Sequence, residues 1–277
     1  MKFLASGVVV FALLPLSLTA QAADMKLPVK APRPAPIVAS SDWSGFYLGV
    51  NGGYGWGSDP VAFSAASAAA TTYFTSGAVP AGVNGSPSGG LFGVQLGYNW
   101  QWTPQMIFGI ETDLDYADIN GAGATSTAVG GGFVPFTTSA AQGLTWLGTL
   151  RGRVGFTLDK ALIYGTGGLA YGRTSLATSV VGLVGSACGP AGLCAGSAST
   201  TWQTGWAAGA GIEWAVSPAL SVKAEYLHYD LGTRSLTQFD PTIPGTVFGS
   251  SASFAGDIVR AGLNFRFGGG GPIVARY

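Results

Sequence analysis

The chain has 277 residues, of which only 9% are charged and 45 are glycine, and its formal net charge is zero. Soluble proteins have about a quarter charged residues, and a zero net charge gives no indication of nucleic-acid binding. No run of about 18 apolar residues follows the N-terminal segment, which argues against a helical membrane protein. This glycine-rich composition, with 12% aromatic residues, favours a transmembrane β-barrel; a low-complexity secreted protein fits less well.

Residues 1–22 are predicted to be a secretory signal peptide. Lys2 precedes an apolar stretch, and Ala20-Gln21-Ala22 fits a small-x-small cleavage site. The alternative is an N-terminal membrane anchor, which the shortness of the apolar run disfavours. Residues 23–41 hold four prolines among basic side chains. They predict an extended periplasmic tail, which is either a spacer or an arm that touches the anionic cell wall.

Residues 144–156, near the middle of the chain, alternate strictly between two kinds of side chain. The even positions, beginning with Leu144 and Trp146, are apolar or glycine, while Arg151 and Arg153 lie on the odd face. Strict alternation predicts a β-strand, because successive side chains point to opposite faces. A soluble sandwich would turn the charged face outward, whereas a membrane barrel would turn it toward the lumen. This strand alone leaves both arrangements open.

Eight segments of this alternating kind are predicted along the chain. They span residues 43–56, 90–102, 105–119, 144–156, 161–174, 201–216, 219–230 and 254–267. In the fifth segment both faces carry apolar side chains, so its orientation stays ambiguous. At about 3.3 Å per residue and a tilt of about 40°, the first segment gives about 25 Å of height, the size of the apolar band of an outer-membrane barrel.

The connections between these segments alternate in length. Long stretches rich in Gly, Ala, Ser and Thr lie at 57–89, 120–141, 175–200 and 231–253. Short turns lie at 103–104, 158–160 and 217–218. Outer-membrane barrels have short periplasmic turns and long outer loops. Residues 42–267 are therefore predicted to be an all-β, eight-stranded antiparallel up-and-down transmembrane β-barrel, with long extracellular loops and both ends in the periplasm.

Four sequence blocks carry a family resemblance: DWSGFYLGVNGGYGW (42–56), LGTLRGRVGF (147–156), YGTGGLAYG (164–172) and VRAGLNFRF (259–267). The chain resembles the small porin-like outer-membrane proteins of alphaproteobacteria, the surface-antigen β-barrel family. The resemblance implies an outer-membrane barrel, often called a porin, in contact with lipid and lipopolysaccharide and inserted by the barrel-assembly machinery. This chain departs from the pattern because residues 268–277 follow its last strand. The assembly signal is therefore either Phe265 and Phe267 or the terminal Tyr277.

Ten charged side chains are predicted to point into the barrel. They are Glu111, Asp113, Asp115, Arg151, Arg153, Glu213, Lys223, Glu225, Arg260 and Arg266. Glu213 is expected opposite Lys223 across a short turn, and Glu111 near Arg151. An eight-stranded barrel is just wide enough for its own side chains to fill, and buried charges cost several kcal/mol unless they are paired. We hypothesise an internal ion-pair plug; the alternative is a narrow polar channel lined by these groups.

The two cysteines, Cys188 and Cys194, lie close together in the third long stretch. In an exported protein such a pair is expected to form a disulfide, and a metal pair is disfavoured because no histidine lies near. His228, the only histidine, has outward parity and is predicted to lie at the membrane interface. A lipid hydrolase would need a serine beside this histidine, and no serine falls near it on the same face of the strand.

The sequence as a whole predicts a monomeric outer-membrane protein without enzymatic activity, cofactor or metal. Its expected role is structural, or that of a narrow porin-like channel for small solutes. The alternative is a surface-exposed adhesin that acts through its extracellular loops.

Overall fold

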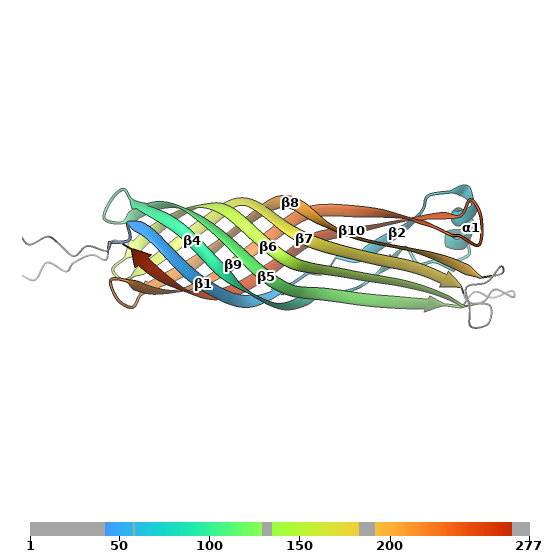
Figure 1. Cartoon of the computed structure of the whole chain (residues 1–277), viewed down its shortest axis with the longest axis horizontal. Coiled ribbons are helices and arrows are strands. Elements are labelled where there is room, and N and C mark those ends of the chain that lie inside the picture. Colours follow the sequence, from blue (N-terminus) through green and yellow to red (C-terminus); the bar gives the residue numbers. More distant parts are fainter. Residues whose placement is uncertain (1–41, 58, 129–134, 183–191, 268–277) are drawn as a thin grey trace, which may run out of the picture. The chain divides into compact units, whose positions relative to one another are not determined.

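The computed structural model describes residues 42–57, 59–128, 135–182 and 192–267 (Figure 1). The predicted signal peptide (1–22), proline-rich tail (23–41) and C-terminal extension (268–277) lie outside the described residues and stay predictions. No helix in the described residues is long and apolar enough to cross a membrane.

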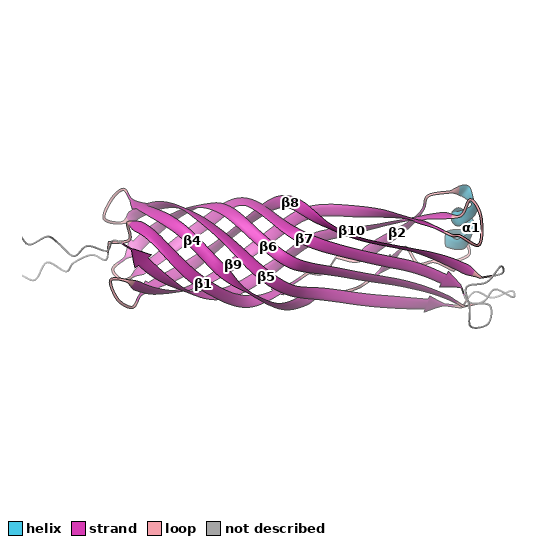
Figure 2. Cartoon of the chain, in the orientation of Figure 1, coloured by secondary structure: helices cyan, strands magenta, loops and turns pink. Residues whose placement is uncertain are grey.

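Eight long strands form a closed ring, as the sequence predicts (Figure 2). They are β1 (Gly45–Trp56), β4 (Ser88–Gln101), β5 (Met106–Thr127), β6 (Phe136–Leu158), β7 (Ala161–Gly182), β8 (Leu193–Ala215), β9 (Leu220–Phe239) and β10 (Val247–Phe267). Each pairs antiparallel with the next, and β1 pairs with both β4 and β10. The ring therefore has no free edge at the height of β1.

We call the end of the ring with the short turns its lower end and the opposite end its upper end; the lower end is on the left in Figure 1. Large apolar side chains cover the outside of the ring in its lower half. Phe46, Val94 and Leu263 are 59%, 54% and 47% exposed. Aromatic contacts border this band at both ends: Phe46 with Tyr98 at 4.7 Å between ring centroids below, and Tyr116 with Trp146 at 5.4 Å above. An apolar band between aromatic girdles is the outer surface of a transmembrane β-barrel.

The ambiguous orientation of the fifth predicted strand is resolved by the burial pattern of β7. Leu162, Tyr164 and Ala170 are buried inside the ring. Ile163 and Leu169 point outward and are 50% and 65% exposed.

The prediction that the four long stretches are loops is wrong. Strands β5 to β10 continue through most of 120–141, 175–200 and 231–253. Beyond the upper aromatic girdle their outward positions hold small residues, such as Ala122, Ser139 and Ala177, while inward positions hold Leu176 and Val180. The alternation continues there with reversed polarity, apolar inside and small or polar outside. That polarity suits strands surrounded by water.

Shifts in strand register accompany this reversal. They lie at Tyr116/Ile119, at Leu144/Trp146 and at Ser253/Ala255. The shift in β6 turns Leu144 inward, where it is 3% exposed. The prediction that Leu144 shares the outer face with Trp146 is therefore wrong, because a bulge changes the face that each residue presents.

The first long stretch, predicted as a loop, is a folded segment. It contains β2 (Val61–Ala65), α1 (Ala68–Thr75) and β3 (Gly82–Val83). β10 pairs with β1 through its lower half, and through residues 248–251 it pairs with β2 instead. The hydroxyl of Ser67 caps α1 by accepting a hydrogen bond from the Ala70 N–H. The first connection thus replaces β1 in the wall above the membrane band.

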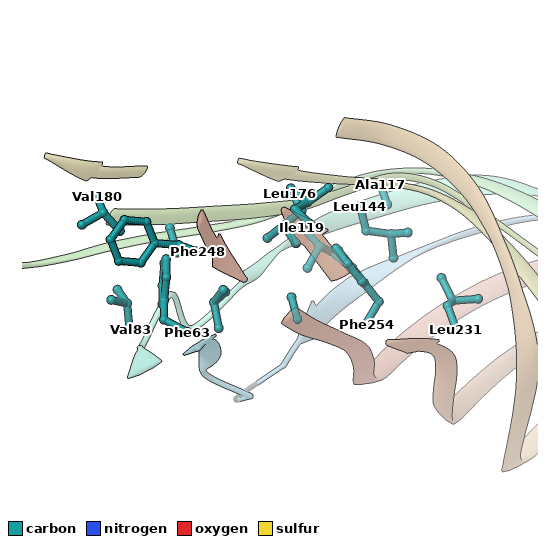
Figure 3. Close-up of a cluster of buried hydrophobic side chains, with 14 of the residues drawn as sticks. Phe63, Val83, Ala117, Ile119, Leu144, Leu176, Val180, Leu231, Phe248 and Phe254 are labelled. Carbon is teal, nitrogen blue, oxygen red and sulfur yellow. The ribbon is translucent and has the colours of Figure 1, made fainter. Parts of the chain in front are cut away.

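Above the ring the wall divides into two sheets. Pairing of β8 with β9 ends at Trp206 and Asp230 in the described residues, although both strands continue. One sheet contains β5 to β8, and the other contains β9, β10, β2 and β3. Figure 3 shows the apolar cluster in this region, where Phe63, Val180 and Phe248 come from different strands.

Candidate functional site

The structure places all ten predicted lumen charges inside the ring. None is more than 6% exposed. They belong to β5, β6, β8, β9 and β10, so the alternation of five strands delivers them to one enclosed volume. The sequence-predicted set is thus brought together, and nine of its ten members form ion pairs with one another.

Arg151 lies at the centre of this network. Its guanidinium contacts Glu111 Oε1 at 2.7 Å, Asp113 Oδ2 at 2.8 Å and Glu225 Oε1 at 3.1 Å. Glu111 lies directly opposite Arg151 in the register of β5 and β6, as predicted. Glu225 comes from β9, so this single side chain connects strands on different sides of the ring.

Arg260 makes a second set of contacts across the interior. Its guanidinium lies 2.7 Å from Asp113 Oδ2, 2.9 Å from Asp115 Oδ2 and 2.7 Å from Glu225 Oε2. The two arginines share Asp113 and Glu225 as partners. Short charge-assisted bonds of this kind hold the side chains in fixed positions.

Glu213 and Lys223 lie opposite each other in register, as expected, yet each is paired with another residue. Glu213 Oε2 lies 2.9 Å from Arg153 Nη2, and Lys223 Nζ lies 3.0 Å from Glu111 Oε1. Both side chains are long enough to reach across the ring, so adjacency in the sheet does not decide their partners.

Two tyrosines belong to the network and were missed from the sequence. The Tyr47 hydroxyl donates to Glu111 Oε2 at 2.7 Å, and the Tyr164 hydroxyl donates to Glu225 Oε1 at 3.0 Å. The Arg153 guanidinium lies 4.1 Å from the Tyr164 ring centroid. The alternation of residues 43–56 places Tyr47 on the inward face, so the sequence could have identified it. Tyr164 could not be identified in this way, because the alternation of residues 161–174 left its face ambiguous.

Arg266 closes the lower end of the ring in a different way. Its guanidinium donates to the carbonyl oxygens of Asp42 and Ser217 at 3.3 and 3.1 Å. It lies 4.4 Å from the ring centroid of Trp43, which is fully buried. The backbone N–H of Trp43 donates to Gln101 Oε1 at 2.9 Å, which holds the residues before β1 beneath the barrel.

Apolar side chains fill the interior above the charges. Ile119, Leu144, Leu231 and Phe254 point into this region (Figure 3). One cavity beside Leu144 and Phe254 has a volume of about 20 Å³. That is room for a single water molecule and not for a solute.

The other predicted sites lie apart from the lumen. His228 is on the outer face, where its Nδ1 lies 2.9 Å from Asp257 Oδ1 and its ring lies 5.4 Å from that of Trp206. Phe265 and Phe267 are outward on β10, each 50% exposed. Within the described part of the chain, no group of three His, Cys, Asp or Glu side chains could hold a metal ion.

The predicted disulfide concerns the upper end of β8. Cys194 lies in that strand, and its backbone N–H donates to Asp240 Oδ2 at 3.0 Å. Cys188 lies outside the described residues, so the pairing of Cys188 with Cys194 stays a prediction.

Comparison with known proteins places this architecture in context. Residues 10–267 match the family model described as outer membrane protein beta-barrel domain. The 31 kDa outer-membrane immunogenic protein of Brucella melitensis is 33% identical over 255 residues, which cover 90% of this chain and 94% of that protein. The 22 kDa outer membrane protein of Rhizobium leguminosarum bv. viciae is 30% identical over 201 residues, covering 72% and 70%. The crystal structure of OprG from Pseudomonas aeruginosa is 11% identical with a TM-score of 0.47, covering 81% of this chain and 96% of that one.

Proposed function

Because the chain belongs to the outer membrane protein β-barrel domain family and lies in the outer membrane, we propose that it is a closed structural barrel that does not conduct solutes. The observation that supports this proposal most directly is the ion-paired network around Arg151 and Arg260, whose members are at most 3% exposed. Trp43 lies below this network and the apolar cluster lies above it. Every level of the lumen is therefore occupied by the protein's own side chains.

The apolar band between the aromatic girdles is in contact with lipid. We further propose that its upper border lies among lipopolysaccharide, that the barrel-assembly machinery inserts the chain, and that the barrel is a monomer. The outward pair Phe265 and Phe267 at the end of β10 supports recognition by that machinery. The closed hydrogen-bonded ring supports a monomer, since it leaves no strand edge free within the lipid band.

Conductance in a planar bilayer tests the closed barrel. Folding is first verified by the gel mobility of unheated and heated samples. Folded protein is expected to give no discrete openings, whereas steady openings of uniform size would reject the proposal in favour of a narrow channel. In that case Glu111 and Arg151 would line the pore.

Surface recognition is the second candidate, because the strands continue beyond the upper aromatic girdle. This part presents small outward side chains, among them Ala141 and Ala177. Folded protein in nanodiscs would be applied to arrays of glycans and extracellular proteins. For a recognition surface, we expect binding that Ala141→Arg and Ala177→Arg abolish. Lys160→Ala, in a turn at the opposite end of the barrel, should leave that binding unchanged. Binding to no arrayed molecule, or equal binding by all variants, would argue against it.

A further inference from the structure

Arg173 of β7 is a basic side chain without a partner on the outside of the ring. It is exposed, and in the described part of the chain it forms no hydrogen bond, ion pair or cation–π contact. Lys160, the other exposed basic residue among those described, lies in a turn at the lower end. Arg234 is half-buried and donates to Ser199 Oγ at 3.0 Å. Arg173 is therefore available to bind an anion from outside the protein.

Two tryptophans flank Arg173 in the sheet. Arg173 lies opposite Trp146 of β6 on one side and opposite Trp202 of β8 on the other. Side chains directly opposite on neighbouring strands share a face, with about 4.5–5.5 Å between their Cβ atoms. Trp146 belongs to the upper aromatic girdle through its contact with Tyr116, and the ring of Trp202 lies 6.4 Å from that of Tyr171. Aromatic side chains of this kind lie at the level of lipid headgroups, so Arg173 lies at that level as well.

Carboxylates are present on the outer face of other strands near the upper girdle. Asp118 of β5 accepts a hydrogen bond from the amide of Asn120. Asp257 of β10 lies 2.9 Å from His228 Nδ1. Within the described ranges, neither aspartate forms an ion pair with Arg173. An anionic headgroup is therefore attracted to Arg173 and repelled from β5 and β10.

The outer face above Arg173 is hollowed and uncharged. Ser175 and Ala177 follow Arg173 on the same face of β7, about 7 and 13 Å farther up at about 3.3 Å per residue. Both line a hollow of about 370 Å³ over β5 to β8, and no charged residue borders it. The hydroxyl groups of Ser175 and Thr200 supply hydrogen-bonding groups there. A polar, uncharged group such as a sugar has room beside an anion bound at Arg173.

We propose that Arg173 binds a phosphate group of lipopolysaccharide, with the adjoining sugars in the hollow lined by Ser175 and Ala177. The planar guanidinium presents paired N–H donors that match a phosphate, and charge strengthens these bonds. Upward along the wall, the aromatic girdle, the cation and the uncharged hollow match the acyl chains, phosphate and sugars of this lipid. The inference rests on the proposed contact of the upper border with lipopolysaccharide and names the site of that contact.

The experiment measures lipid binding to the detergent-folded full chain by native mass spectrometry. Bisphosphorylated lipid A, dephosphorylated lipid A and lipopolysaccharide with core sugars are titrated separately. We expect Arg173→Gln to raise the Kd for bisphosphorylated lipid A at least about tenfold, because it removes charge-assisted hydrogen bonds. Arg173→Lys should raise it less, since it keeps the charge and loses the planar fork. Lys160→Gln, the matched control at the lower end, should bind like wild type.

Two further comparisons separate the phosphate from the sugars. Dephosphorylated lipid A should bind wild type and Arg173→Gln equally weakly. Ala177→Phe fills the hollow, so it should weaken the binding of lipopolysaccharide with core sugars and leave the binding of lipid A unchanged. Both positions are exposed, so both variants are expected to fold, which gel mobility verifies.

The opposing outcomes are distinct. Equal binding of bisphosphorylated lipid A by wild type and Arg173→Gln would overturn this site while the proposed contact with lipopolysaccharide stands. Binding of no lipid by any folded variant would reject that contact as well. Displacement of bound lipid A by excess inorganic phosphate would assign Arg173 to free phosphate and overturn the lipid source. An unchanged affinity of Ala177→Phe for lipopolysaccharide would overturn the placement of the sugars, while the bilayer recording independently tests whether the barrel is closed.

Discussion

Arg151 shows most clearly how single residues hold this barrel together, since it contacts three carboxylates from two strands. Arg151→Ala would leave Glu111, Asp113 and Glu225 with too few counter-charges. We expect the free energy of unfolding to fall by about 3–5 kcal/mol, the typical effect of breaking a buried ion pair. Urea unfolding of the folded protein in micelles measures this change.

The matched control is Arg173→Ala, because Arg173 is exposed on the outside of β7. It should change the free energy of unfolding by less than about 0.5 kcal/mol. Equal effects of the two substitutions would contradict a stabilising role for the lumen network.

Which residues enter the lumen could be predicted at the residue scale, whereas their partners could not. Alternation assigns a face to each side chain, and it assigned all ten charges inward. Partner choice depends on side chains that cross the ring. Glu213 therefore binds Arg153 on another strand, although Lys223 is its neighbour in the sheet. The alternation of a strand shows which face a side chain lies on, but not which side chain across the ring it reaches.

At the scale of whole elements, the extensions of the strands beyond the membrane band could not be predicted, because their composition resembles that of loops. Stretches such as 120–141 are rich in glycine, alanine, serine and threonine, which is also typical of loops. In β5 and β6 these residues occupy outward positions or allow close packing, and their amides pair in the ladder between Asn120–Gly143 and Thr127–Phe136. The eight membrane-spanning segments were predictable because their outward side chains are large and apolar.

Amide hydrogen exchange distinguishes strand from loop in these extensions. Residues 137–143 of β6 pair on both sides, with β5 and with β7. Their amides are therefore expected to exchange at least about a hundredfold more slowly than those of the turn at Asp159 and Lys160, because opening them requires breaking the ladder. Mass spectrometry of peptides from the folded protein measures this. Exchange as fast as in the turn would show that the stretch is a loop.

Among the described residues, three successive layers of different chemistry fill the lumen. Trp43 and Arg266 form the lowest layer, the ion-paired network the middle one and the apolar cluster the highest. Trp43→Ala should lower the free energy of unfolding by about 3–5 kcal/mol, as expected for a large buried aromatic side chain. It should nevertheless leave the barrel silent in a planar bilayer, because two layers remain.

Recording Trp43→Ala beside Trp102→Ala tests this arrangement, since Trp102 is 65% exposed outside the lumen. Openings that occur only in the Trp43 variant would show that this residue alone closes the pore. The overall closure of the ring was predictable from eight alternating segments. The ion-paired middle layer was also predicted, whereas the apolar upper layer was not, because it depends on a folded first connection and on a bulge that turns Leu144 inward.

The reversed polarity of the long hairpins also bears on how the chain reaches the cell surface. If the chain inserts from the periplasm, the tips of these hairpins must cross the hydrocarbon layer. Each charged residue at the centre of a bilayer raises the energy of that passage by about 2.5–3.5 kcal/mol. The sequence has no charged residue between Ile119 and Leu144 or between Thr174 and Gly205, and only Arg234 and Asp240 between Leu231 and Gly256. The small uncharged side chains of the outer wall therefore lower the kinetic barrier to translocation, and the charges that stabilise the finished barrel stay in the half that never crosses.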